Sequence, residues 1–95
     1  MRAKAYPIAK FRLGRIASTA SALSQLTQED ILLGIQRHQA GDWGDVSNDD
    51  RKENDLSLEK GFRLWSVYHT AKGVKFWLIT EADRSVTTVL LPGDY

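Results

Sequence analysis

The chain has 95 residues, a formal net charge of +1 and 42% hydrophobic residues, which is typical of one small globular domain and excludes a disordered chain. It has no cysteine, so disulfides, thiolate metal sites and a cysteine nucleophile are excluded. No apolar run reaches the roughly 18 residues of a membrane span, and the basic start lacks the apolar centre of a signal peptide. We expect a soluble, cytoplasmic protein without membrane contact, with residues 1–95 in one domain and residues 1–10 as an irregular tail.

The first half of the chain predicts one strand and two helices. Residues 11–17 are typical of a strand, and Ser18 or Thr19 is placed to cap a short helix after it. Residues 27–41 predict the clearest helix, because they combine a capping-box pattern, an apolar stripe and a terminal glycine. His38 falls in its last turn, where the negative end of the helix dipole is expected to favour the charged form of the imidazole.

Residues 41–55, GDWGDVSNDDRKEND, are strongly acidic and contain a single aromatic residue, Trp43. Ser47 followed by acids predicts the start of a third helix, and Gly61 its end. A calcium loop is excluded, because the spacing puts neither a glycine nor a bidentate glutamate at the required positions. Trp43 either plugs the core under this loop or belongs to a recognition surface.

The second half predicts strands. Residues 62–70, 74–80 and 85–91 are rich in β-branched and aromatic residues, and the intervening loops are short enough for hairpins. We therefore predict an α+β fold. Its antiparallel sheet has three or four strands, made of this C-terminal meander and a candidate fourth strand at 11–17, and two to three helices pack on one face.

If each loop has two residues, alternation divides the meander into two faces. The face expected to receive the helices collects Trp65, Val67, His69, Phe76, Leu78, Thr80, Thr87, Val89 and Leu91. The other, mixed face collects Leu64, Ser66, Tyr68, Thr70, Lys75, Trp77, Ile79, Glu81, Val86, Thr88 and Leu90. The predicted core is Leu13, Ile16, Leu23, Ile31, Ile35, Trp65, Val67, Phe76, Leu78, Val89 and Leu91. A loop one residue longer would exchange the faces of one strand.

The mixed face and the acidic segment together indicate a protein-binding surface, with aromatic anchors and free carboxylates. The predicted partner-binding residues are Trp43, Asp45, Asp49, Asp50, Glu53, Tyr68 and Trp77. Three alternatives would cover the mixed face instead: the first helix, the N-terminal tail, or a second copy in a homodimer. In a homodimer the basic residues 1–40 of one copy would approach the acidic residues 41–61 of the other.

A catalytic alternative uses His69, the one candidate general base near hydroxyls and cations. With Lys75, Arg84 and Thr88 it would cleave RNA, with the histidine as base and the cations on the phosphate. Nucleic acid is a partner only in this alternative, and a histidine that merely bonds to a turn is the competing interpretation. No metal-ligand spacing and no glycine-rich phosphate loop is present, so neither a metal nor a cofactor is predicted.

Two resemblances extend this interpretation. The segments GDWGDV, FRLWSVYHT and KFWLITEADRSVTTVLLPGDY together resemble a family of small uncharacterised proteins carried on plasmids and integrative elements of proteobacteria. This resemblance implies a mobile-element origin and suits a non-enzymatic module that inhibits a host or defence protein.

The order of strand, helices and three-strand meander is similar to the RelE/ParE toxins, and FRLGRIASTASALSQL would match their first strand and helix. This likeness implies a toxin that cleaves RNA or blocks translation. The basic cluster of the ribonuclease members is reduced here to Arg63, Lys72, Lys75 and Arg84.

Overall fold

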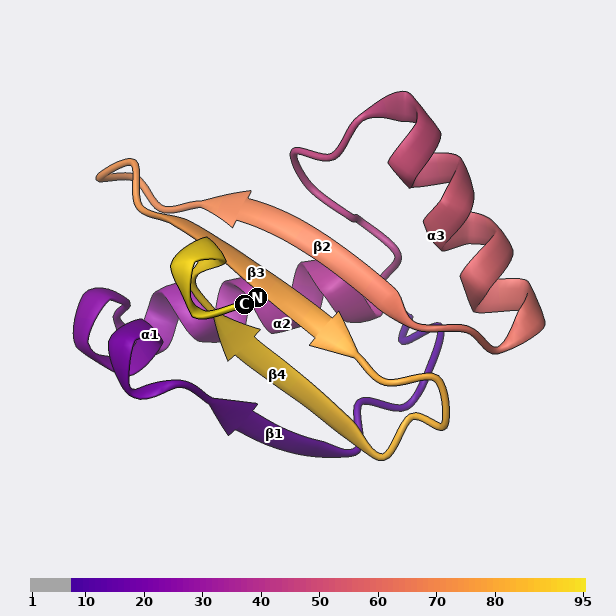
Figure 1. The fold of residues 1–95 in the computed structure, drawn as a ribbon, viewed down its shortest axis with the longest axis horizontal. Coiled ribbons are helices and arrows are strands. Elements are labelled where there is room, and N and C mark those ends of the chain that lie inside the picture. Colours follow the sequence, from indigo (N-terminus) through magenta and orange to yellow (C-terminus); the bar gives the residue numbers. More distant parts are fainter. Residues whose placement is uncertain (1–7) are drawn as a thin grey trace, which may run out of the picture.

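The computed structural model describes residues 8–95, which form three α-helices and a four-stranded sheet, so the α+β class is confirmed (Figure 1). In chain order the elements are β1 (Arg15–Ser18), α1 (Ala20–Gln25), α2 (Gln28–Gln39), α3 (Asn48–Lys60), β2 (Leu64–His69), β3 (Lys75–Thr80), β4 (Val86–Leu90) and the 3-10 helix η1 (Pro92–Asp94). Residues 1–7 of the predicted tail lie outside the described range, and residues 8–10 join no helix or strand. None of the described helices is long and apolar enough to cross a membrane.

The sheet has the order β1-β4-β3-β2 and is mixed. Both hairpins of the meander are antiparallel as predicted, but β1 runs parallel to β4, so the prediction of a fully antiparallel sheet is wrong. The direction of β1 is tied to the helix after it, because Thr19 donates its N–H to the Val89 carbonyl (3.0 Å) and also caps α1. The strand starts later than predicted because Gly14, at φ +66°, turns against the Ser85 carbonyl, where a Cβ would clash.

The helix starts follow the capping chemistry of the sequence. Thr27 and Asp30 form the predicted capping box, with each side chain accepting from the backbone N–H of the other (3.0 and 2.9 Å). Thr19 and Ser47 cap α1 and α3 with one bond each, accepting from the N–H of Ala22 and of Asp50 (3.1 Å each), without the reciprocal bond of a capping box. The predicted end of α3 is also confirmed, because Gly61 closes it in the left-handed conformation.

The main core lies between the sheet and the first two helices, which run behind the strands in the view of Figure 1. It contains Ala22, Leu26, Tyr68, Phe76, Leu78 and Val89, with Ile31, Ile35, Val74 and Leu91 packed against it. α2 comes close to the sheet because Gly34 faces the Phe76 ring, which an added Cβ would approach to 2.9 Å. This face of the sheet is the one that the helices cover.

The predicted register of β2 is wrong by one residue. Trp65 lies opposite Ile79, and Tyr68 lies opposite Phe76. The cause is the hairpin turn, in which the N–H of Thr70 donates to the carbonyl of Val74 (2.9 Å) and three residues lie between them instead of two. Because side chains alternate, this odd number exchanges the two faces of β2 relative to β3. The helix-covered face therefore receives Leu64, Ser66 and Tyr68, and the opposite face receives Trp65, Val67 and His69.

The exchange and two local effects account for the errors in the predicted core. Trp65 moves to the opposite face with β2, and Val67, although buried, is buried from that face. Ile16 is 43% exposed because it lies on the edge strand β1. Leu23 is 61% exposed because α1 turns Ala22 into the core instead. Of the remaining predicted members, Phe76, Leu78 and Val89 are buried, and Leu13, Ile31, Ile35 and Leu91 are half-buried.

The outer edge of β2 is closed by other parts of the chain. The Asn54 side chain accepts from the Trp65 N–H (3.0 Å) and donates to the Trp65 carbonyl (2.6 Å), as a neighbouring strand would. One step further, the Val67 N–H and carbonyl bond to residues 43–45, around Gly44. α3 therefore lies beside β2 (Figure 1), and only α1 and α2 cover a face of the sheet. A closed edge cannot pair with another chain.

Candidate functional site

The candidate site is the sheet face opposite α1 and α2, called here the open face. The register places on it Arg15, Ala17, Trp65, Val67, His69, Lys75, Trp77, Ile79, Val86, Thr88 and Leu90. Neither α1 nor residues 8–14 cover it, because Ala22 belongs to the other face and Leu13 accepts there from the Thr87 hydroxyl (2.8 Å). Ile79 and Leu90 are only 6% and 5% exposed, so a second copy is not needed to bury them.

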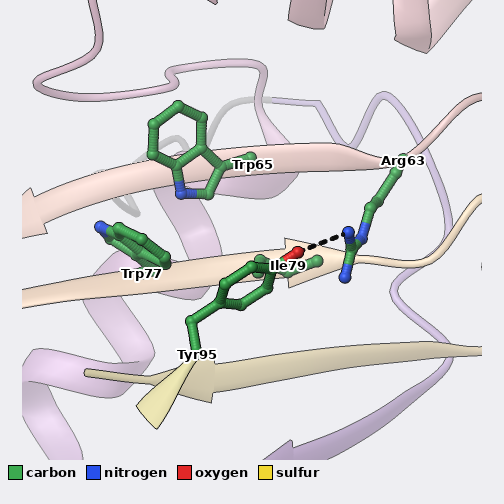
Figure 2. Close-up of a pocket in the computed structure, with 5 residues that line it drawn as sticks. All are labelled: Arg63, Trp65, Trp77, Ile79 and Tyr95. Atoms are coloured by element: carbon green, nitrogen blue, oxygen red, sulfur yellow. Dashed lines mark hydrogen bonds between the residues drawn. The ribbon is translucent and has the colours of Figure 1, made fainter. Parts of the chain in front are cut away.

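A pocket of about 310 Å³ lies on this face, lined by Arg63, Trp65, Trp77, Ile79 and Tyr95 (Figure 2). The two tryptophans are diagonal neighbours on β2 and β3, with ring centroids 5.3 Å apart and ring planes at 85°. The ring of Tyr95 lies 5.7 Å from that of Trp77 at 64° and stands over Ile79. Three aromatic rings in different orientations thus surround the pocket.

Arg63 supplies the charge of this pocket. Its Nη1 donates to the Tyr95 hydroxyl (2.9 Å), and its guanidinium lies 5.6 Å from the centre of the Tyr95 ring. On the other side its Nε is 3.6 Å from a carboxylate oxygen of Glu81. Both members of that ion pair are about half exposed, so the pair contributes little stability. The Arg63 guanidinium therefore stays accessible to solvent beside the pocket.

The indole Nε1 atoms of Trp65 and Trp77 are covered by neighbouring atoms and have no acceptor within residues 8–95. A buried donor without a partner costs about 1–3 kcal/mol. The two N–H groups are therefore a local cost of packing the indole rings on the sheet, and neither is exposed to the pocket.

Tyr95 is held over the pocket by the residue before it. The Asp94 carboxylate accepts from the hydroxyls of Thr19 (2.7 Å) and Ser21 (2.5 Å) and from the Leu91 N–H (2.9 Å). These hydroxyls, Ser21 first, hold the pKa of Asp94 below its ordinary value. The start of α1 therefore anchors η1, although Tyr95 itself stays 71% exposed.

Two of the predicted partner-binding residues are buried. Trp43 is 1% exposed and donates its Nε1–H to Asp55 (2.9 Å), so it plugs the loop and its assignment to a surface is wrong. Tyr68 is 2% exposed on the helix-covered face, where its hydroxyl donates to the Asp42 carbonyl and burial raises its pKa far above the ordinary value. Its assignment to the mixed face is wrong because the predicted register of β2 is off by one residue, which exchanges the faces of Tyr68 and Trp65.

The other predicted partner-binding residues are accessible. Asp49, Asp50 and Glu53 lie in the first half of α3 and take part in none of the ion pairs of residues 8–95. Asp45 bonds to His69 at the β2 edge. Trp77 lies in the pocket. The structure therefore separates an acidic surface on α3 from an aromatic surface on the sheet.

The residues of the catalytic alternative are brought together only in part. His69 Nδ1 lies 2.7 Å from a carboxylate oxygen of Asp45, and His69 is the cross-strand partner of Lys75. Thr88 lies further along the sheet, opposite Ile79. Arg84 lies in the turn beyond the other end of β3, where it donates to main-chain carbonyls of α3 and of the α3–β2 connection. These four residues do not share one pocket.

His38 belongs to a buried polar chain. The Thr87 hydroxyl donates to the Leu13 carbonyl (2.8 Å), so it must accept from Thr80 (2.7 Å). Thr80 then accepts from His38 Nε2–H (2.8 Å), which leaves Nδ1 to accept from the Ser66 hydroxyl (2.5 Å). Burial lowers the pKa of His38 to about 3, so the expectation that the helix dipole favours its charged form is wrong.

Sequence reasoning missed Arg63, Trp65 and Tyr95 as site residues. Trp65 was placed in the core by the register error, and the only signal against it was the three-residue turn. Tyr95 follows the last strand, and nothing local predicts that Asp94 binds α1 and brings the ring back over β3.

No group of three or more His, Asp or Glu side chains in residues 8–95 lies close enough to hold a metal ion. Comparison with protein-family models, with curated proteins and with solved structures finds no match to this chain.

Proposed function

We propose that this chain is a non-enzymatic protein-binding module and that the open face is its recognition surface. The observation that carries the proposal is the pocket, where the side chains of two tryptophans, a tyrosine and an arginine meet on the open face. Tryptophan, tyrosine and arginine are the residue types that dominate the energy of protein interfaces. His38 supports the proposal as well, because both of its ring nitrogens are bonded in the buried interior and it does not line the pocket.

In the mobile-element form of this proposal, the bound protein is a host or defence protein that the module inhibits. The free carboxylates of Asp49, Asp50 and Glu53 would then meet a basic region of that protein, such as a nucleic-acid channel. This form draws its support from the sequence resemblance and from the accessible acidic surface of α3.

A pull-down from a proteobacterial lysate tests the module. The double variant Trp65→Ser/Trp77→Ser should lose the proteins that the wild type recovers, and Arg63→Glu should lose them with less risk to the fold. Leu32→Ser is the matched control, because Leu32 is an exposed apolar residue (57%) on the outer side of α2. Circular dichroism checks that each variant folds. Identical recovery by the wild type, Arg63→Glu and the folded tryptophan variant would show the proposal to be wrong, and Asp49→Lys/Asp50→Lys/Glu53→Lys tests the acidic surface separately.

One contact favours the RelE/ParE-like toxin as a second candidate function. An accessible histidine held by a carboxylate, as His69 is by Asp45, has the arrangement of a general base, and Lys75 stands opposite it. Induced expression would then arrest growth, and His69→Ala or Lys75→Ala would relieve the arrest. Arg84→Ala is a weaker test, because Arg84 also braces its turn. Unaffected growth under strong induction would end this candidate.

A further inference from the structure

The sheet has one edge that no part of residues 8–95 covers. Asn54 and residues 43–45 close the edge at β2, but β1, the lowest strand in the view of Figure 1, has no described helix or strand on its outer side. An open edge carries unpaired backbone N–H and C=O groups, onto which another strand can pair. β1 is therefore the place where a strand of another chain can extend this sheet.

The backbone groups that point outward belong to Ile16 and Ser18. On the inner side of β1, the N–H groups of Arg15 and Thr19 donate to the carbonyls of residues 85 and 89 (2.9 and 3.0 Å). Because successive residues of a strand bond to opposite sides, Arg15, Ala17 and Thr19 bond toward β4, and Ile16 and Ser18 bond away from it. Ile16 is also 43% exposed although it is apolar. An added strand would meet two N–H and two C=O groups and would cover Ile16.

A second copy of β1, running antiparallel, matches these groups. With Ile16 opposite the partner's Ser18, each of the two symmetric pairs exchanges two N–H···O bonds, four in all. Ala17 then faces its own copy across the two-fold axis, where Cα atoms lie only about 4.5 Å apart and a small side chain fits. A register shifted by two residues keeps only one of the two pairs, because Gly14 turns away at one end and α1 begins at the other.

The same register brings opposite charges together twice. Arg15 falls opposite the partner's Thr19, and the Thr19 hydroxyl donates to the carboxylate of Asp94 (2.7 Å). Each Arg15 guanidinium therefore approaches the partner's Asp94. Within residues 8–95 neither Arg15 nor Asp94 belongs to an ion pair, and the hydroxyls of Ser21 and Thr19 hold the pKa of Asp94 below its ordinary value, so it is charged at neutral pH.

The remaining charges at the two ends of β1 favour the antiparallel direction as well. The first end has Arg12 before the strand and Asp83 and Arg84 in the adjacent β3–β4 turn, so with Arg15 it is positive overall. At the second end α1 and η1 contain one charged side chain, Asp94. Antiparallel pairing joins a positive end to a negative one, whereas parallel pairing would join like charges.

We propose that β1 pairs antiparallel with β1 of a second copy, forming a symmetric dimer with one continuous sheet of eight strands. A two-fold interface needs only one self-complementary segment, which this edge supplies. Side chains of paired strands keep their faces, so both open faces lie on the same side and both pockets stay uncovered. The dimer thus goes beyond the proposed binding function and does not depend on it. With strands this short, the interface belongs among the small and weak ones.

Single cysteines test the register directly, because the chain has no cysteine of its own. Ala17→Cys places two thiols beside the two-fold axis, within the Cα–Cα range of a disulfide, about 4.4–6.8 Å. With copper-phenanthroline as oxidant it should form linked dimers at least about tenfold faster than Thr88→Cys. Thr88 is the matched control, because it is the neighbour of Ala17 on β4, one strand away from the edge.

Sedimentation equilibrium of the unlinked chain, from about 10 µM to about 1 mM, measures the dimer itself. Ile16→Pro should raise its dissociation constant at least about tenfold, because two of the four bonds lose their donor. The proline breaks no bond to β4, since the N–H of Ile16 points outward, and circular dichroism checks the fold. Ile16→Thr keeps that N–H and should weaken the dimer much less. Arg15→Glu should weaken it, whereas Arg51→Glu, the same charge change on α3, should not.

A mass of one chain at every concentration would overturn this inference, as would a dimer that Ile16→Pro leaves unchanged. Faster linking of Thr88→Cys than of Ala17→Cys would place the second copy on the open face and would overturn it too. A monomer that loses its lysate proteins on Ile16→Pro would assign the edge to a strand of a different protein. Each of these results leaves the proposed function standing, because that function is tested by the variants of Arg63, Trp65 and Trp77.

Discussion

Acid should destabilise this protein through His38, beginning well above the pH at which ordinary carboxylates titrate. The imidazole is fully buried, and its two nitrogens bond to Ser66 and Thr80 in an arrangement that only the neutral ring satisfies. Burial first, and the positive charge of Arg84 second, lower its pKa from 6.5 to about 3. A second proton would have to enter between His38 Nδ1 and the Ser66 hydroxyl and would place an uncompensated charge in the core.

The sign and size of the effect follow from proton binding. Between pH 6.5 and about pH 3 the unfolded chain binds a proton at His38 and the folded chain does not, so acid favours unfolding. The free energy of unfolding then falls by about 1.4 kcal/mol per pH unit. Relative to pH 8 the loss is about 2 kcal/mol at pH 5 and about 3 kcal/mol at pH 4. Domains of this size have only about 5–15 kcal/mol in total.

Urea unfolding followed by circular dichroism between pH 8 and pH 5, at constant ionic strength, measures this loss. His38→Gln should flatten the pH dependence, because an amide can donate to Thr80 and accept from Ser66 but does not titrate. His69→Gln is the matched control for the other histidine and should keep the dependence. An unfolding free energy that is the same at pH 5 and pH 8 would refute the reasoning, and so would an unchanged slope in His38→Gln.

Three further predictions concern stability and are checked by the same urea titration at pH 7.5. Asn54→Ala should lower the free energy of unfolding by about 1–3 kcal/mol, because both backbone bonds to Trp65 are lost and the β2 edge opens; a change below measurement error would contradict this role. Gly44→Ala should cost more than Asn54→Ala or prevent folding, because the new Cβ would lie 2.0 Å from the Val67 carbonyl oxygen at φ +76°, and a stable variant would show that the bridge is dispensable. Thr27→Ala should cost about 1 kcal/mol through loss of the α2 cap, and no loss would mean that the capping box is unimportant here.

The residues of the open face could be predicted only in part from the alternation of side chains along the strands. Alternation along β3 and β4 correctly predicted that Trp77 and Thr88 share a face. The β3–β4 connection has an even number of residues, as the assumed two-residue loop does, so the faces of the two strands match the prediction. One extra residue in the β2–β3 turn moved Trp65 beside Trp77 and moved Tyr68 into the core. The pocket therefore exists because of a turn of three residues, a feature that composition and periodicity do not determine.

The sequence by itself determined the elements whose causes are local. The caps at Thr27 and Ser47, the C-terminal stop at Gly61 and the β-branched segments after it all act within a few residues of chain, so the α+β class could be predicted. Tertiary structure alone decided what depends on distant partners. It set β1 parallel to β4, made His38 neutral by burying it, and brought Tyr95 back over Trp77 through Asp94. Each of these depends on desolvation or on bonds across the fold, which outweigh the local preferences of the residues concerned.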